Sequence, residues 1–293
     1  MATTTDYLKL HFIVLLWGAT AILGKLISIP AVEMVFYRTL LAAAGMVVLV
    51  AITRGQFSVT TGDFFKLIAV GLLVGAHWIA FFASGQVSTA SVSLVGFATA
   101  SLWTAIIEPM SNGKKIKPLE VGLGFFVIIG LAIIFHFDFE FYLGLVLGIL
   151  SGLLLAVFAV INSHFVKRLP SATITLYEMA GGFLFTAAFL PVYQKYWAEG
   201  NALQLTPTTL DWFYISVLAI VCSVYAYSLS IELMKRISVF VIQLTLNLEP
   251  VYGIIMAVLI LDESKYLSLS FYIGTLIILM SVLTYPWLKR KLT

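Results

Sequence analysis

The stretch that decides the fold runs from residue 237 to residue 261 and reads ISVFVIQLTLNLEPVYGIIMAVLIL. It contains one charged side chain, Glu249, which stands near the middle of the stretch beside Pro250. A helix of about 20 apolar residues spans the roughly 30 Å hydrocarbon core of a bilayer. The run is too long and too uniform for the alternating strands of a membrane β-barrel. It therefore predicts a transmembrane helix with a polar group near the middle of the membrane.

The rest of the chain has the same character. Of its 293 residues, 61% are hydrophobic and 11% are charged, whereas a soluble domain is about 45–50% apolar and about 25% charged. The sequence predicts an all-α membrane protein with ten transmembrane helices. Their approximate spans are 8–29, 32–53, 63–87, 91–110, 118–137, 141–166, 171–194, 211–233, 237–261 and 267–288.

The basic residues predict the orientation. With these spans, 13 of the 17 basic residues fall on one side of the membrane, in the tails and in the loops that follow even-numbered helices. They are Lys9, Arg54, Lys66, Lys114, Lys115, Lys117, Lys167, Arg168, Lys235, Arg236, Lys289, Arg290 and Lys291. Lys25, Lys195 and Lys265 fall on the other side, and Arg38 lies within the second span. By the positive-inside rule both termini are cytoplasmic, and we expect the protein in a bacterial cytoplasmic membrane.

The second half of the chain echoes the first. Three matches recur in the same order, at offsets of 148, 147 and 140: Asp63-Phe64-Phe65 with Asp211-Trp212-Phe213, Ser91-Val92 with Ser238-Val239, and Pro30 with Pro170. Chance likeness between apolar helices is the alternative to a duplication. A duplication predicts two five-helix units, residues 1–138 and 139–293. Because five is odd, the second unit enters the membrane inverted, as in many secondary transporters, whose sites lie between the repeats.

Two motifs resemble those of the drug/metabolite transporter superfamily, EamA type. One is Leu16-Trp17-Gly18-Ala19-Thr20, and the other is Leu248-Glu249-Pro250-Val251-Tyr252-Gly253. The resemblance covers nearly the whole chain. It implies two five-helix repeats, transport without ATP hydrolysis and, in many members, export of amino acids or related metabolites. The first half departs from the pattern, because Leu102-Trp103 occupies the place of Glu249-Pro250.

The ninth span supplies the first candidates for a substrate site. Glu249 lies about 12 residues into it, near the midplane, and Pro250 predicts a kink because proline removes a backbone hydrogen bond. At about 100° per residue, Gln243 and Asn247 share a face with Pro250, whereas Glu249 lies well around the helix. Both faces reach one cavity only if the kink twists the helix. The alternative is a structural glutamate bonded to a neighbouring helix.

Other spans add further candidates. His77 lies near the midplane of the third span, and its counterpart in the repeat is Tyr225. The two predict half-paths related by the repeat, unless the aromatic side chains simply pack. Arg38 either binds an anionic group or extends its head to the interface. Trp17 and Tyr177 could offer aromatic walls for a cation or a ring.

Several classes of function are disfavoured. A net charge of +3 is too small to indicate nucleic-acid binding, and the single cysteine, Cys222, excludes a disulfide framework. The four histidines lie far apart in the sequence, so we expect no metal, no cofactor and no enzyme. A channel would need a ring of charges or a carbonyl filter, commonly from several subunits.

The leading interpretation is a monomeric carrier in the lipid bilayer that takes a small molecule and exports amino acids or related amines. Import of a quaternary amine such as choline, or proton-coupled antiport, is the alternative.

Overall fold

The computed structural model describes residues 2–137, 139–262, 268–284 and 287–288, and this part of the chain is helical without strands. Lys265, Lys289, Arg290 and Lys291, which entered the charge count, lie outside the described residues. The helices are α1 (Thr4–Gly18), α2 (Thr20–Leu26), α3 (Ala31–Ile52), α4 (Thr61–Val87), α5 (Ala90–Phe97), α6 (Ala100–Ser111), α7 (Pro118–Phe137), α8 (Tyr142–Phe165), α9 (Ser171–Tyr196), α10 (Thr209–Val217), the π-helical segment η3 (Leu218–Tyr225), α11 (Ala226–Leu233), α12 (Val239–Leu246), α13 (Glu249–Leu261) and α14 (Leu269–Leu283). Two short 3-10 turns, η1 (Phe139–Phe141) and η2 (Glu199–Asn201), complete the order.

The described helices suit a membrane. Eight helical stretches are long and apolar enough to cross one, and four of them combine shorter segments: Thr4–Leu26, Ala90–Ser111, Thr209–Leu233 and Val239–Leu261. α7 and α14 occupy the places of the fifth and tenth predicted spans. At 15 residues, α14 is shorter than the roughly 20 that a span needs. The structure therefore agrees with an all-α, multi-pass architecture, and the total of ten spans stays a prediction.

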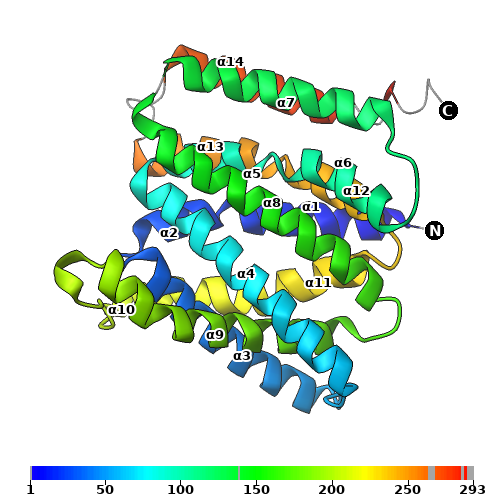
Figure 1. Ribbon diagram of the computed structural model, residues 1–293, viewed down its shortest axis with the longest axis vertical. Coiled ribbons are helices and arrows are strands. Elements are labelled where there is room, and N and C mark those ends of the chain that lie inside the picture. Colours follow the sequence, from blue (N-terminus) through cyan, green and yellow to red (C-terminus); the bar gives the residue numbers. More distant parts are fainter. Residues whose placement is uncertain (1, 138, 263–267, 285–286, 289–293) are drawn as a thin grey trace.

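The helices lie side by side in one bundle, with α7 and α14 paired along one edge (Figure 1). We call the end at which α1 begins the N-terminal end of the bundle. The chain also turns there at residues 53–60, 112–117, 166–170 and 234–238. The opposite end carries the turns at residues 27–30, 88–89 and 197–208. Arg54, Lys115, Lys167 and Arg236 thus share the N-terminal end, as the orientation argument requires.

Three predicted spans are interrupted. The first breaks at Ala19, between α1 and α2, and the fourth breaks at residues 98–99, between α5 and α6. The ninth breaks at Asn247 and Leu248, so Pro250 falls in the first turn of α13. Proline is tolerated there because the first helical N–H groups have no intrahelical partner. The predicted kink is thus a break, which begins just before the proline.

Glycines set the closest helix contacts. A Cβ built on Gly71 of α4 would lie 2.7 Å from the Cα of Gly181 on α9, and one on Gly96 of α5 would lie 2.9 Å from the Cα of Gly148 on α8. Side chains larger than hydrogen do not fit at such distances. Small residues let membrane helices approach and gain van der Waals contact in the absence of a strong hydrophobic force between them.

The two ends of the bundle carry related contacts. Asp63, at the start of α4, pairs with Arg168, which precedes α9. Asp211, at the start of α10, accepts hydrogen bonds from the backbone and hydroxyl of Ser28, which precedes α3, at 2.7 and 2.6 Å. Asp63 and Asp211 are 148 residues apart, and Ser28 and Arg168 are 140 apart, which are offsets of the predicted repeat. The division into residues 1–138 and 139–293 stays a prediction.

Candidate functional site

A cavity lies inside the bundle where the broken helices meet. Its empty volume, with the open space at its mouth included, is about 650 Å³. Six aromatic side chains form much of its wall: Trp17, Trp78, Phe81, Phe97, Phe158 and Tyr227. The lining extends to Met234, at the C-cap of α11, on the side of the N-terminal end. The wall of the cavity is therefore largely apolar and aromatic.

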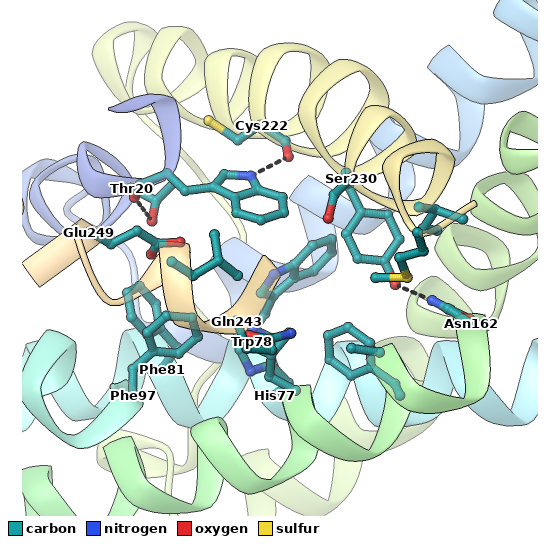
Figure 2. A pocket seen from close by; sticks show the side chains of 18 of the residues that line it. Thr20, His77, Trp78, Phe81, Phe97, Asn162, Cys222, Ser230, Gln243 and Glu249 are labelled. Carbon is teal, nitrogen blue, oxygen red and sulfur yellow. Dashed lines mark hydrogen bonds between the residues drawn. The ribbon is translucent and has the colours of Figure 1, made fainter. Parts of the chain in front are cut away.

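The break in the ninth span brings Glu249 and Gln243 into the same cavity (Figure 2). Gln243 belongs to α12, whereas Glu249 opens α13. Each is 2% exposed, and the Oε1 atom of each is buried without a hydrogen-bond partner in the described part of the chain. Because the two residues belong to separate helices, a continuous helical phase does not relate them. This break removes the conflict between the two faces that the sequence presented.

Arg38 is held inside the bundle and lines the cavity. It is 2% exposed, its Nε donates to Ser223 Oγ at 3.0 Å, and its guanidinium carbon lies 3.8 Å from the centre of the Trp78 ring. Ser223 belongs to η3 and in turn donates to the carbonyl of Leu218, five residues earlier. The interpretation in which Arg38 extends to the interface is therefore wrong, because Trp78 and Ser223 hold the head group inside.

Trp17 and His77 also lie in the cavity wall, and both are fixed by hydrogen bonds. Trp17 donates from Nε1 to the carbonyl of Cys222 at 2.9 Å, and it also lines the cavity. The Nδ1 atom of His77 lies 2.9 Å from both the carbonyl and the hydroxyl oxygen of Ser151. A histidine bound in this way has one ring nitrogen occupied by a structural hydrogen bond.

Three other predicted residues lie elsewhere. Tyr225 is 49% exposed, and its ring contacts Phe12 and not the cavity. Its prediction assumed an ordinary α-helix, but Tyr225 ends the π-helical segment, whose extra residue shifts the side chains around the axis. Tyr177 donates to the carbonyl of Phe57 at 2.7 Å, next to the connection before α4. The placement of Tyr225 and Tyr177 in the cavity wall is therefore wrong. Asn247, 2% exposed, lies at the break itself.

The sequence missed several lining residues, of which Tyr227 and Asn162 matter most. The Tyr227 hydroxyl lies 3.2 Å from the Asn162 amide nitrogen, which donates to it. Tyr227 stands two residues after the wrongly placed Tyr225, so a correct helical phase through η3 would have selected it. Asn162 had a weaker signal, as one amide in the apolar run of α8. Among the described residues, no group of three His, Cys, Asp or Glu side chains gathers as metal ligands would.

Comparison with known proteins places this architecture. The EamA-like transporter family matches residues 7–136 and again residues 142–285. An uncharacterized transporter of Archaeoglobus fulgidus is 25% identical over 228 residues, which are 75% of this chain and 77% of that protein. A solved crystal structure superimposes with a TM-score of 0.73 over 99% of each chain, and at 14% identity it shows the fold alone. Because the two family matches cover most of the sequence, this multi-pass membrane protein belongs to the EamA-like transporter family.

Proposed function

We propose that the protein exports amino acids with large apolar side chains and that it binds them as zwitterions in the central cavity. Membership of a transporter family supports transport but leaves the substrate open. The substrate class is therefore argued from the charges and the shape of the cavity.

One observation carries the proposal: two opposite charges line the same cavity without pairing. Arg38 and Glu249 both contribute to the lining. The ion pairs found among the described residues join other side chains, so these two are not within 4 Å of each other. A charged group inside a membrane is costly unless it is paired. A zwitterion supplies both partners, since its ammonium group suits Glu249 and its carboxylate suits the guanidinium of Arg38.

The aromatic wall favours a large apolar side chain. Phe81, Phe97 and Phe158 surround the ring of His77, with ring centres 5.4–6.4 Å from it. Aromatic rings pair with other rings and with aliphatic groups at little cost in conformational freedom. An amino acid such as phenylalanine or leucine would fill this part of the cavity, and Gln243 would offer it a neutral polar contact.

Transport would follow from movement of the two halves around this fixed site. Discontinuous helices that meet at the substrate are typical of carriers in which inverted repeats rock against one another. With the basic N-terminal end in the cytoplasm of a bacterial cell, the cavity lies on the path from cytoplasm to exterior. We predict that the transporting unit is a monomer.

A quaternary amine is the second candidate substrate. The rings of Trp17 and Trp78 line the same cavity as Glu249, and aromatic rings near a carboxylate are the surroundings that recognise such cations. This alternative gives Arg38 no role in binding and sets its positive charge against that of the substrate. We therefore prefer the zwitterion.

Counterflow in proteoliposomes tests the proposal. Vesicles that contain the purified protein are loaded with one unlabelled compound and then given a trace of the labelled form. We expect exchange with phenylalanine or leucine, and little exchange with choline or with phenethylamine, the amine that corresponds to phenylalanine. Exchange of choline without exchange of either amino acid would contradict the proposal and favour the second candidate.

A further inference from the structure

A second carboxyl group lies just behind the cavity wall. Glu178 of α9 has no exposed surface, and its Oε2 accepts hydrogen bonds from the Tyr227 hydroxyl at 2.8 Å and from the Asn162 amide at 3.2 Å. Its Oε1 is buried without a hydrogen-bond partner among the described residues. Tyr227 and Asn162 both line the cavity, so Glu178 is one hydrogen bond away from it.

Among the described residues, none places a positive charge against Glu178. Tyr227 is the titratable side chain that faces it within the described part of the chain. The other charged or titratable groups on the helices around it either bind to other partners or, like Lys66, are exposed. Those that bind to other partners are Arg38 and Glu33 of α3, Asp63 and His77 of α4, His164 of α8 and Glu232 of α11. The two neutral donors compensate a buried negative charge only in part. The group is thus arranged to be neutral while it is enclosed and to ionise only when water reaches it.

We propose that Glu178 is the proton site that couples substrate export to proton entry. This inference rests on the proposed function, since it assigns the driving force to the same carrier. In one state Glu178 holds a proton taken from external water. In the other, the carboxylic acid releases that proton to cytoplasmic water and becomes a carboxylate, and one substrate molecule leaves the cell in exchange for it.

Tyr227 gives this site its connection to the cavity. When the proton arrives, the Tyr227 hydroxyl gives its own proton to the Glu178 carboxylate and takes one from water in the cavity. The phenol is unchanged at the end, and the carboxylate has become an acid. Release reverses the two transfers. Glu249 stays free to hold the substrate amine, so the structure assigns substrate binding and proton binding to different carboxyl groups.

The test separates exchange from accumulation. The full-length protein is reconstituted with labelled phenylalanine as the probe, and potassium with valinomycin clamps the membrane potential. Counterflow at equal pH measures exchange, and a lumen one pH unit more acidic than the medium measures accumulation. For one proton per substrate, a difference of one pH unit sets a ceiling of about tenfold accumulation. A pH-sensitive dye in the lumen records whether protons leave as phenylalanine enters.

Glu178→Gln keeps the size of the side chain and its hydrogen-bonding groups, and it removes the ionisable proton. We expect this variant to exchange phenylalanine within about twofold of the parent rate, but to show neither accumulation nor a dye signal. Glu232→Gln, on the neighbouring α11 and paired with Lys235, is the matched control and should accumulate like the parent protein.

Three results would overturn the proton role. They are accumulation by Glu178→Gln equal to that of the parent, loss of counterflow in that variant, and a parent protein that exchanges phenylalanine without accumulation under a pH difference. Absence of counterflow from the parent would instead contradict the proposed function, and the proton role would fall with it.

Discussion

Glu249 is the residue on which binding of the substrate amine depends in this account. It lies at the first position of α13, where the helix N-terminus favours a negative charge, and its Oε1 is buried without a hydrogen-bond partner among the described residues. A bound ammonium group would satisfy that oxygen. The free energy gained on binding should therefore depend on the charge of Glu249 more than on its size.

We predict that Glu249→Gln weakens phenylalanine binding by about 10- to 100-fold, since hydrogen bonds to charged groups contribute about 1.5–3 kcal/mol. Equilibrium binding to the detergent-solubilised protein measures the change. Glu199→Gln, the same replacement in the exposed connection before α10, is the control and should bind like the parent. Equal affinity in the parent and Glu249→Gln would exclude Glu249 from the site.

For Arg38 we predict a change in selectivity. Arg38→Met fills similar volume beside Trp78 but leaves the substrate carboxylate without a partner. Exchange of phenylalanine should fall about tenfold or more, because an unpaired charged group loses more than about 1–3 kcal/mol, whereas the low exchange of phenethylamine seen with the parent should not fall further. Counterflow with both compounds measures the ratio, and Arg54→Met at the exposed turn after α3 is the control. A parallel loss for both compounds would indicate that Arg38 has a purely structural role.

At the residue scale, the sequence predicted how deep a residue lies in the membrane better than it predicted where its side chain points. Counting residues from the membrane edge placed Glu249 and His77 near the middle, and both line the cavity, as does the predicted aromatic wall residue Trp17. The count failed for Tyr225, because its side-chain direction depends on the π-helical segment before it. The prediction of an aromatic wall failed for Tyr177, whose hydroxyl is held at the Phe57 carbonyl. The first failure comes from a change of helix type within the span and the second from a contact with another segment, and α-helical periodicity specifies neither.

Among the elements, the broken helices decide what the cavity contains. The separation of α12 from α13 at residues 247–248 turns Gln243 and Glu249 towards one space, and the break between α5 and α6 at residues 98–99 lies at a related place in the first half. The Glu249-Pro250 pair predicted the break between α12 and α13. The break between α5 and α6 has no proline beside it, so the sequence of that span predicted a continuous helix.

The close contact of α4 with α9 gives a prediction about stability. Gly71→Ala places a methyl group against the backbone of Gly181, which cannot move aside as a side chain could. We expect the free energy of unfolding to fall by about 1–3 kcal/mol, the usual cost of overpacking.

Unfolding in mixed micelles measures this change. Gly122→Ala on α7 is the matched control, since nothing lies within 4 Å of the added methyl group, and alanine there should raise helix stability by up to about 1 kcal/mol. An equal effect of the two substitutions would show that α4 and α9 do not pack so closely.

At the scale of the whole molecule, the basic residues predict orientation. We predict that Lys115→Cys is labelled by a membrane-impermeant maleimide only after the cells are opened, because residues 112–117 would face the cytoplasm. Glu199→Cys, at the opposite end of the bundle, should be labelled in intact cells.

Both variants are made with Cys222→Ala, which removes the one native cysteine, a buried residue. Labelling of Lys115→Cys in intact cells, with Glu199→Cys protected, would reverse the topology and the direction of the proposed export.

Much of the overall architecture was predictable, because hydrophobicity over about 20 residues is a property of each stretch alone. Ten predicted spans correspond to eight long apolar helical stretches and the pair formed by α7 and α14. The contacts around the cavity were not predictable in the same way. The Ser223 support for Arg38 joins residues 185 positions apart, and the Tyr227 bond to Glu178 joins residues 49 apart.

The central claim is that the cavity recognises a zwitterion between Arg38 and Glu249, and competition binding tests it most directly. Labelled phenylalanine is bound to the solubilised parent protein and displaced by unlabelled phenylalanine, by phenethylamine, which lacks the carboxylate, or by 3-phenylpropionate, which lacks the amine. We predict that phenylalanine displaces the label and that each analogue binds at least about tenfold more weakly, because each leaves one buried charge unpaired. Displacement by phenethylamine at the same concentration as phenylalanine would contradict the claim.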